Sequence, residues 1–242
     1  MKIKGIGQLL IQTSSLIAGF MVWVIISSLM PFIKEDMHLT STQIAWATAV
    51  PIILGSILRV PIGYWTNRYG ARILFSMSFI ILLLPILLIR YASSIQMLIL
   101  GGLLLGLGGA VFSIGVTSLP KYYDKTKYGL INGIYGAGNI GTAITSFLAP
   151  VLANTIGWRN TVSLYLILVL LFSILNLLLG DKQESNIRQP LAVQIKGVSK
   201  KPKLWILSLF YFVTFGSFVA FTIYLPSFLV NQFELDKIDA GI

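Results

Sequence analysis

One charged side chain lies well inside an apolar stretch of the sequence, and its chemistry is that of an anion-binding group. Arg59 lies in the run from Val50 to Pro61, where it is the only charged residue. A guanidinium inside a bilayer is unfavourable by several kcal/mol unless it faces water, finds a partner or reaches an interface. Its planar fork donates paired hydrogen bonds to two oxygens of one ligand. Arg59 is therefore a candidate binding group for a small trigonal oxyanion.

The acidic residues offer Arg59 no counter-ion inside an apolar stretch, because all of them are predicted to lie in loops. They are Glu35, Asp36, Asp124, Asp181, Glu184, Glu234, Asp236 and Asp239. A substrate anion is then the expected counter-ion. The alternative is structural: Arg59 lies about seven residues, or roughly 10 Å of helix, from a membrane interface toward which its side chain can extend.

A glycine-rich stretch supplies a second candidate. The run from Gly133 to Gly141 contains four glycines, which leave a notch where a backbone or a ligand can approach. Packing between helices explains such glycines alone, but Asn139, an uncharged donor and acceptor, favours a polar ligand. A similar series, Gly101 to Gly109, precedes Phe112. Packing is the expected role there, although Phe112 is kept among the candidate substrate contacts.

Composition requires that membrane-spanning elements position these residues. Of the 242 residues, 56% are hydrophobic and only 11% are charged, and the mean hydropathy is +0.85. A soluble domain carries roughly a quarter charged residues. Seven stretches approach the length of about 20 residues that a helix needs to cross a bilayer, and helices satisfy their own backbone there. An all-α membrane protein is predicted, with spans over Leu9–Ile33, Gln43–Trp65, Ile73–Ile89, Met97–Leu119, Gly129–Ala153, Thr161–Leu179 and Leu204–Val230.

The distribution of lysine and arginine predicts the orientation in the cell membrane. With the N-terminus in the cytoplasm, thirteen of these residues lie in cytoplasmic segments and four lie on or near the outside. Cytoplasmic loops of membrane proteins carry such an excess of positive charge. The same bias explains the net charge of +10 and the pI near 9.8. Nucleic-acid binding is therefore not expected.

The residue types that most enzymes and metal sites need are scarce. The chain has no cysteine, and its single histidine, His38, has no neighbouring histidine or cysteine. No nucleophile–base pair or metal-ligand set lies in the predicted spans. The expected protein is neither an enzyme nor a cofactor-binding protein, and its expected partners are a small anion and the lipid bilayer.

Loop lengths divide the chain into three parts. Residues 1–180 form a predicted six-helix bundle, 181–203 a long basic cytoplasmic loop, and 204–242 a seventh span that begins an incomplete second bundle. Long loops of this kind join the two halves of many secondary transporters. A weak internal repeat agrees with this division, because Pro31 and Pro226 each precede aliphatic residues and a polar turn.

The segment that joins the second and third spans resembles the loop signature of the major facilitator superfamily. In Gly63-Tyr64-Trp65-Thr66-Asn67-Arg68-Tyr69-Gly70-Ala71-Arg72, both arginines and the glycine between them fit that signature. Asn67 departs from it, because an aspartate is usual at this place. The resemblance predicts the superfamily fold: a six-helix N-terminal bundle followed by the first helix of a second bundle.

Three further stretches resemble the nitrate/nitrite porter family of that superfamily. They are the segment around Arg59, the Gly-Ala-Gly-Asn-Ile-Gly run at 136–141, and the segment from Tyr211 to Phe218. The resemblance implies that Arg59 binds the anion, that Gly138 and Asn139 belong to its nitrate signature, that Tyr211 donates a hydrogen bond and that Phe215 and Phe20 are rings against the anion. Tyr135 stands where some members have glycine. The family's second substrate arginine lies in the eighth helix, beyond Ile242.

The function implied by the resemblance is secondary transport of nitrate and nitrite by alternating access, by a monomeric transporter. Spans without a carboxylate relay favour exchange of nitrate for nitrite, and proton-coupled symport stays open. The alternatives are a facilitator of another solute, which would not need Arg59, and a channel or receptor, which would lack the repeat between halves.

Overall fold

A computed structural model describes residues 3–185, 187 and 189–233, and within these residues every regular element is helical. Seven helical segments are long and apolar enough to cross a membrane, which confirms the seven predicted spans. The elements are α1 (Ile3–Trp23), α2 (Ile25–Met37), α3 (Ser41–Tyr69), α4 (Ala71–Arg90), α5 (Ile95–Leu105), α6 (Leu107–Ala110), α7 (Phe112–Ser118), η1 (Leu119–Tyr122), η2 (Lys125–Lys127), α8 (Tyr128–Gly136), η3 (Ala137–Asn139), α9 (Ile140–Ile156), α10 (Trp158–Leu179), α11 (Leu191–Ser199) and α12 (Pro202–Phe233).

Three of the spans are interrupted, which the hydropathy pattern did not predict. The first is interrupted at Val24, the fourth at Gly106 and again at Val111, and the fifth by the short 3-10 turn η3. A change of helix type redirects the backbone and the side chains beside it. Phe20, Phe112 and Asn139 all lie at or within a turn of such an interruption. Broken helices near the middle of the membrane are typical of transporter binding sites.

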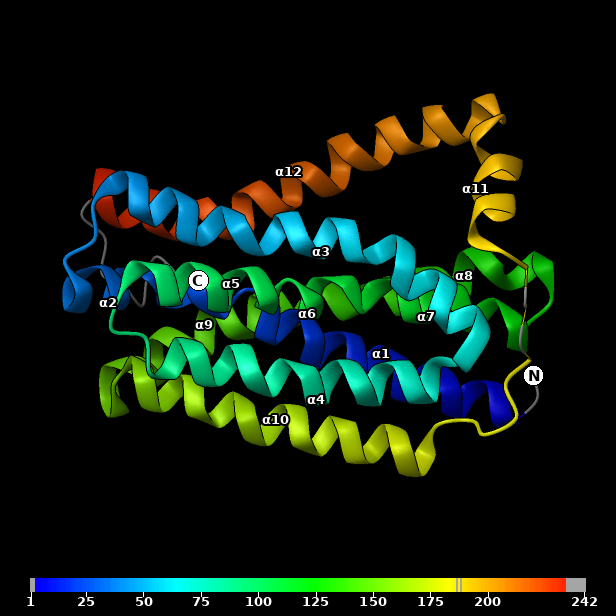
Figure 1. The fold of residues 1–242 in the computed structure, drawn as a ribbon, viewed down its shortest axis with the longest axis horizontal. Helices are drawn as coiled ribbons and strands as arrows, with labels where there is room; N and C mark the ends of the chain where they lie inside the picture. Colours follow the sequence, from blue (N-terminus) through cyan, green and yellow to red (C-terminus); the bar gives the residue numbers. More distant parts are fainter. Residues whose placement is uncertain (1–2, 186, 188, 234–242) are drawn as a thin grey trace.

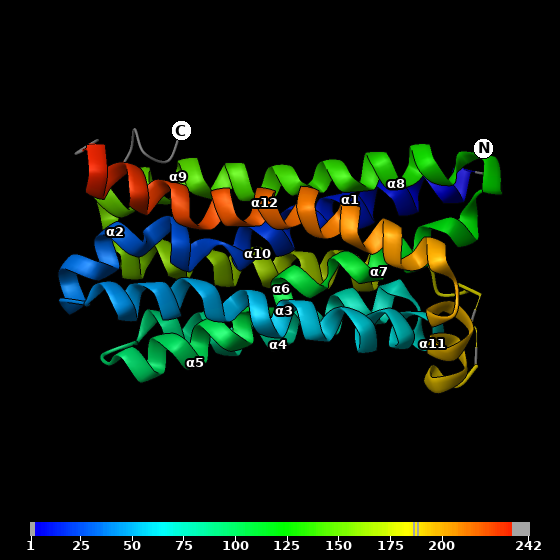
Figure 2. The ribbon, with the colours of Figure 1, turned by 90° about the horizontal axis from the view of Figure 1, so that it is seen from above.

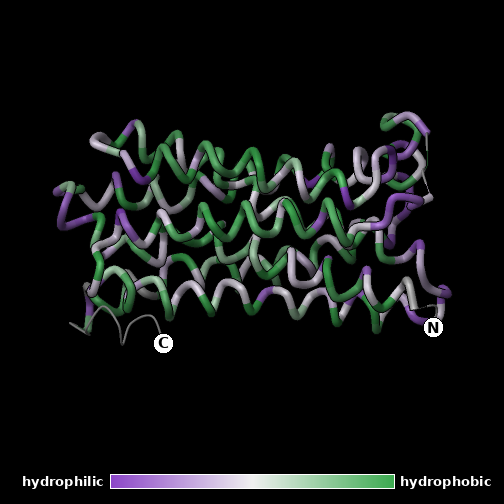
Figure 3. The backbone as a smooth tube through the Cα atoms, turned by 90° about the horizontal axis from the view of Figure 1, so that it is seen from below, coloured by the Kyte–Doolittle hydropathy of each residue, from purple (hydrophilic) through white to green (hydrophobic). Residues whose placement is uncertain are grey.

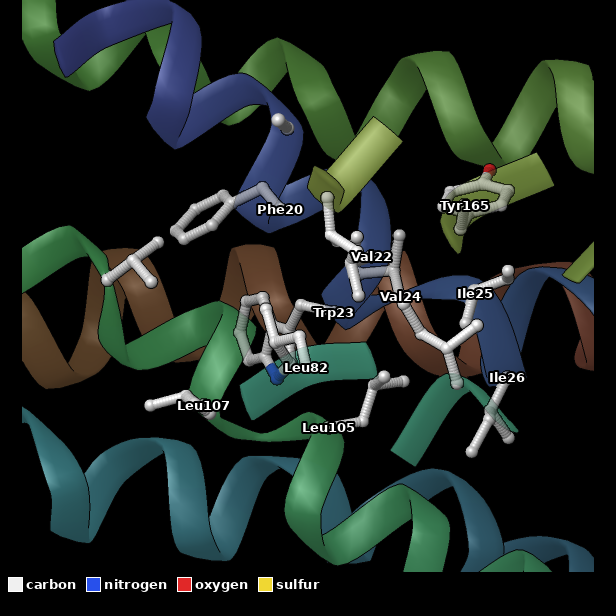
Figure 4. Packing of buried hydrophobic residues seen from close by; sticks show 14 of the residues in the cluster. Phe20, Val22, Trp23, Val24, Ile25, Ile26, Leu82, Leu105, Leu107 and Tyr165 are labelled. Atoms are coloured by element: carbon white, nitrogen blue, oxygen red, sulfur yellow. The ribbon is translucent and has the colours of Figure 1, made fainter. Parts of the chain in front are cut away.

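The first span forms the centre of the bundle. Helix α1 contacts α6, α8, α9 and α10, and α4 and α10 lie side by side along the molecule (Figures 1 and 2). Figure 4 shows Phe20 and Trp23 of α1, with Leu107 of α6 on the Trp23 side of this group and Tyr165 of α10 farther along. All four side chains are buried. The rings and branched side chains of α1 therefore hold the six-span bundle around them.

Polar residues gather at the two ends of the bundle, and apolar residues fill the length between them (Figure 3). We call one of these ends the basic end; it holds the start of α1, the α3–α4 turn, η1, η2 and α11 (Figure 1). The tight turns before α4 and α10 each begin with a glycine at φ +82°, Gly70 and Gly157. A side chain is strained in that left-handed region, so glycine permits the sharp reversal between neighbouring spans.

The segment that follows α10 runs along the basic end. The carboxylate of Glu184 accepts hydrogen bonds from the backbone N–H of Ala71 at 2.7 Å and from Nζ of Lys121 at 2.8 Å. The backbone N–H of Ile187 donates to the carbonyl of Asn67 at 2.8 Å. A carboxylate thus reaches the α3–α4 turn from the connecting segment, although Asn67 replaces the aspartate of the loop signature.

Helix α12 packs on the bundle at one end and diverges from it at the other. It contacts α2, α3 and α9, and it slopes away from α3 toward α11 at the basic end (Figure 1). Most of its described large apolar side chains are exposed, among them Trp205, Phe212 and Phe221. Such a surface is compatible with lipid or with further helices.

The structure corrects the prediction that every acidic residue lies in a loop. Glu35 and Asp36 lie in the last turn of α2. Asp36 pairs there with Arg159 and accepts a hydrogen bond from Nε1 of Trp158 at 3.2 Å, so it fastens the start of α10 to the end of α2. Glu234, Asp236 and Asp239 lie outside the described residues.

Candidate anion-binding site

Arg59 points inward, toward α7 and α12. Its Nη1 donates a hydrogen bond to the hydroxyl oxygen of Tyr211 at 3.0 Å. Its guanidinium carbon lies 4.8 Å from the ring centroid of Phe215 and 5.5 Å from that of Phe112. Both rings are within the range of a cation–π contact. These contacts direct the side chain toward α7 and α12, whereas the structural alternative for Arg59 requires it to extend toward a membrane interface.

The guanidinium keeps unused donor capacity. Its Nε is buried and has no hydrogen-bond partner among the described residues. Tyr211 accepts the bond from Arg59, so the tyrosine keeps its own O–H proton for another acceptor. A buried N–H without an acceptor is unfavourable by about 1–3 kcal/mol, and more when the group is charged. This arrangement suits an anion that takes N–H and O–H donors at the same time.

Aromatic rings of α7 and α12 lie against the arginine, and a ring of α1 extends the group. Tyr211 and Phe215 lie one turn apart on α12 and stack at 5.0 Å with an interplanar angle of 11°. The ring centroid of Phe112 on α7 lies 6.4 Å from that of Phe215, and the centroid of Phe20 on α1 lies 6.4 Å from that of Phe112. The structure therefore brings five of the seven predicted site residues into one connected group.

A small cavity opens beside this group, with a volume of about 210 Å³. It is lined by Arg59, Gly63, Phe112, Ser113, Val116, Thr117 and Tyr211. One water occupies about 30 Å³ in the liquid, so the cavity has room for a small ion with a few waters. Its polar side chains are those of Arg59, Ser113, Thr117 and Tyr211, and no carboxylate of the described residues lines it.

Sequence reasoning missed Ser113, Val116 and Thr117. Val116 and Thr117 follow Ser113 by three and four residues, which places them on the same face of a helix as Ser113. The sequence shows this helical spacing. The neighbouring glycines were assigned to packing, and no role was assigned to the helix face that carries these three residues.

The close approach of α3 to the fourth span sets the position of Arg59. A Cβ built on Gly55, one turn before Arg59, would lie 2.8 Å from the carbonyl oxygen of Gly106, and one on Gly106 would lie 2.5 Å from that of Pro51. Only glycines allow the two backbones to come so near. The packing role predicted for this glycine series is confirmed, and the contact fixes the depth at which Arg59 faces α7.

The glycines around Asn139 fall into two groups. A Cβ on Gly138 would collide with Leu16 at 2.7 Å, and one on Gly141 with the carbonyl of Ile17 at 2.2 Å. Gly133 and Gly136 have nothing within 4 Å of a built Cβ. Gly138 is thus packed against α1, and the open part of the notch lies one turn earlier.

Asn139 has a free acceptor, but the structure does not join it to the arginine. Its Nδ2 donates to the carbonyl of Gly136 at 2.7 Å, and its Oδ1 is buried without a partner among the described residues. Within the described part of the chain, no hydrogen bond connects it to Arg59 or Tyr211. The substrate roles of Asn139 and Gly138 remain predictions.

Metal chemistry has no candidate ligand set in this part of the molecule. Within residues 3–185, 187 and 189–233, no three His, Cys, Asp or Glu side chains gather closely enough to hold a metal ion. The chemistry available at Arg59 is reversible binding through charge, hydrogen bonds and ring faces.

Comparison with known proteins identifies the family and supports the fold. The family model described as Major Facilitator Superfamily matches residues 13–242. A nitrite extrusion protein of Bacillus subtilis (strain 168) is 59% identical over 97% of this chain and 60% of its own length. A probable nitrate transporter, NarT, of Staphylococcus epidermidis is 59% identical over 99% of this chain and 62% of its own length. The predicted resemblance to nitrate/nitrite porters is confirmed, and the chain spans about three fifths of the length of these relatives.

Solved structures show the same fold at low sequence identity. A bacterial homolog of the human lysosomal transporter Spinster, in an inward-facing and unoccupied conformation, has a TM-score of 0.74 at 17% identity, covering 100% of this chain and 59% of that one. Its inward-facing and occupied form has a TM-score of 0.73 at 19% identity, over 97% of this chain and 56% of that one. Together with the matched family model and the seven spans, this likeness establishes that the chain is a multi-pass membrane protein and belongs to the Major Facilitator Superfamily.

Proposed function

We propose that this chain belongs to a transporter that exchanges nitrate for nitrite across the cell membrane. One observation carries the proposal: Arg59 lies in a small cavity without a carboxylate, and its polar contact is the neutral hydroxyl of Tyr211. A trigonal oxyanion matches the planar donors of a guanidinium. The relatives that share 59% of the aligned residues are named for nitrite extrusion and nitrate transport.

In the proposed complex, the residues of the site divide the work of recognition. Arg59 supplies positive charge and N–H donors to the anion. Tyr211, whose oxygen already accepts from Arg59, donates its proton to a second anion oxygen. The faces of Phe215 and Phe112 cover a flat ion and exclude larger or more hydrated anions. Phe20 of α1 and Asn139 of the fifth span complete the site.

Alternating access follows from the position of the site. Arg59 belongs to the six-helix bundle of residues 1–180, whereas Tyr211 and Phe215 belong to α12, which we propose opens a second bundle after the connecting segment 181–203. Rocking of the two halves would make and break this contact. The basic end faces the cytoplasm in this proposal. The transporting unit is a monomer, because one chain contributes both sides of the site.

Exchange is proposed rather than proton symport because of the charges at the cavity. An empty cavity leaves the Arg59 guanidinium without an anion, which makes the return of the unloaded transporter unfavourable. A proton relay inside a membrane generally uses carboxylates or histidines, and neither residue type lines this cavity.

Counterflow measured in proteoliposomes that contain the full-length protein tests the proposal. Vesicles loaded with nitrite are expected to take up isotope-labelled nitrate saturably and much faster than empty vesicles. Uptake into empty vesicles that requires an inward proton gradient would establish symport instead. Uptake that never saturates and does not respond to internal nitrite would identify a channel, and the absence of any nitrate uptake would remove the substrate assignment.

A further inference from the structure

Tyr135 is buried in the bundle although the proposed site does not use it. It lies on α8, it is fully buried, and it has the largest volume among the fully buried side chains of the described residues. Its hydroxyl lies 3.3 Å from the carbonyl oxygen of Val111 and 3.2 Å from that of Phe112. A tyrosine with this burial normally finds a hydrogen-bond partner. The unusual feature is which carbonyls Tyr135 reaches.

The two carbonyls belong to the interruption of the fourth span. Helix α6 ends at Ala110, Val111 forms a turn, and α7 begins at Phe112. The backbone N–H of Ile114 donates to the carbonyl of Val111 at 2.9 Å, a spacing of three residues and therefore a tighter turn than an α-helix. The Tyr135 hydroxyl supplies a further donor at the place where the regular helical bonding changes.

The surroundings of Tyr135 are shaped for its ring. A Cβ built on Gly115 would lie 2.2 Å from Cζ of Tyr135, so the ring occupies the space of a side chain on α7. The ring of Tyr135 also lies 5.7 Å from that of Phe112. Helix α8 thus holds α7 by a ring in a glycine gap and by a hydroxyl on the interruption.

We propose that Tyr135 is a positioning residue that sets Phe112, and through it Arg59, for anion binding. Phe112 is the link because its ring contacts Tyr135, Phe20 and Phe215 and lies 5.5 Å from the Arg59 guanidinium. Among the described residues, no hydrogen bond joins Tyr135 to the side chain of Arg59 or Tyr211, so it acts through the backbone at Val111 and Phe112. This inference rests on the proposed function for its transport consequence, but its structural part does not.

Tyr165 provides a matched control for a substitution at Tyr135. It is also buried, and its hydroxyl makes a buried 2.8 Å hydrogen bond with Thr145. It lies on α10, and within the described residues no hydrogen bond or ring contact joins it to Phe112. Tyr135→Phe and Tyr165→Phe therefore remove the same atom from the same kind of environment, and both keep the ring that fills the core.

Two measurements on the full-length protein test the inference. The first is nitrate counterflow, in which Tyr135→Phe is expected to raise the KM about fivefold and to leave the maximal rate within about twofold, the size expected for one neutral hydrogen bond. Tyr165→Phe is expected to leave both values unchanged. Equal KM values for Tyr135→Phe and the parent, in a protein that does transport nitrate, would overturn the inference.

The second measurement does not depend on nitrate. Residues 1–242 contain no cysteine, so Ser113→Cys places one thiol in the cavity wall directly after Phe112. Its labelling rate by a small water-soluble thiol reagent, followed by mass spectrometry of that peptide, is expected to rise at least threefold with Tyr135→Phe and to stay constant with Tyr165→Phe. Equal rates in both backgrounds would overturn the inference even if transport is confirmed. A changed rate in a protein that does not carry nitrate would keep the positioning role and remove the proposed substrate.

Discussion

Arg59 is a partly buried charged side chain and Glu184 an almost fully buried one, and the groups around them differ in kind. Glu184, at the basic end, is 3% exposed and accepts from the Lys121 ammonium and from the backbone N–H of Ala71, at 2.8 and 2.7 Å. Arg59, in the bundle, bonds to the neutral hydroxyl of Tyr211 and faces aromatic rings, while its Nε has no partner among the described residues.

The difference separates a charge that holds the fold from a charge that is available to a ligand. A buried carboxylate is tolerated when an ion pair and hydrogen bonds satisfy it. The backbone N–H of Ala71 has no acceptor within α4, because it lies in the first turn of the helix, and such N–H groups bind anions. Glu184 has both. Arg59 has rings and one hydroxyl, and in the proposed transporter the bound anion supplies the missing counter-charge. The two regions should therefore respond to substitution in opposite ways.

Removing the cation of the satisfied pair should have the largest effect, and the effect should be on stability. Lys121→Met leaves Glu184 buried without its counter-ion, which is expected to lower the free energy of unfolding by about 3–5 kcal/mol. The change is measured as a loss of thermal stability in detergent. Nitrate KM, measured on protein that remains folded, is expected to be unchanged. A full loss of nitrate affinity with normal stability would break the distinction between the two regions.

The converse is expected at the site. Arg59→Lys keeps the positive charge but removes the planar fork and its contacts with two rings, so nitrate counterflow should fall on the order of 100-fold. Stability should change little, because the arginine makes no ion pair in the described part of the chain. Arg90→Lys is the matched control: Arg90 ends α4 at the other end of the bundle and lies over Tyr91, 5.2 Å from its ring. Full transport by Arg59→Lys would remove Arg59 from the site.

Tyr211→Phe sharpens the comparison, because it removes the one polar group that the structure places on Arg59. The ring and its stack on Phe215 remain, so the loss is the hydroxyl that accepts from Arg59 and is proposed to donate to the anion. Nitrate KM is expected to rise about tenfold, the effect of one hydrogen bond to a charged group. Tyr224→Phe, on the same helix, is the control. An unchanged KM would mean that the anion does not contact Tyr211.

The fold could be predicted from the sequence because lipid imposes a simple requirement. Each span needs about 20 apolar residues and internal backbone bonds, so all seven helices were visible in hydropathy. The interruptions at Val24, Val111 and Ala137–Asn139 were not predicted. Gly106 and Gly138 lie at or near interruptions, but glycine is equally common in straight packed helices. Whether a glycine breaks a helix depends on neighbours that only the folded chain brings together.

The candidate site was predicted only in part, because some of its contacts join residues that only the folded chain brings together. Arg59 was recognised because a charge inside an apolar span needs an explanation, and Tyr211 and Phe215 because of a family resemblance. The tertiary contacts were not recoverable: Gly55 against Gly106 aims the arginine, and Tyr135 fills the gap above Gly115. The contacts of Glu184 with Ala71 and Lys121 join three separate segments of the chain. Nothing in the local sequence distinguishes that glutamate from an exposed loop residue.

Glu184→Gln has the smallest expected effect on stability, and it discriminates best between the roles of Glu184 and Arg59. The amide keeps an oxygen that can accept from the Ala71 N–H, and it removes the buried negative charge together with the ion pair, so Lys121, 9% exposed, can move toward water. Because desolvation of the charge is relieved as the pair is lost, the expected loss is only about 1 kcal/mol. The double variant with Lys121→Met should then be more stable than Lys121→Met alone, since no unpaired charge remains buried. Thermal unfolding of the four proteins in this cycle measures the coupling. If Glu184→Gln instead changed nitrate KM while the cycle showed no coupling, Glu184 would act on the anion path, and Arg59 would no longer be the distinctive charge of this bundle.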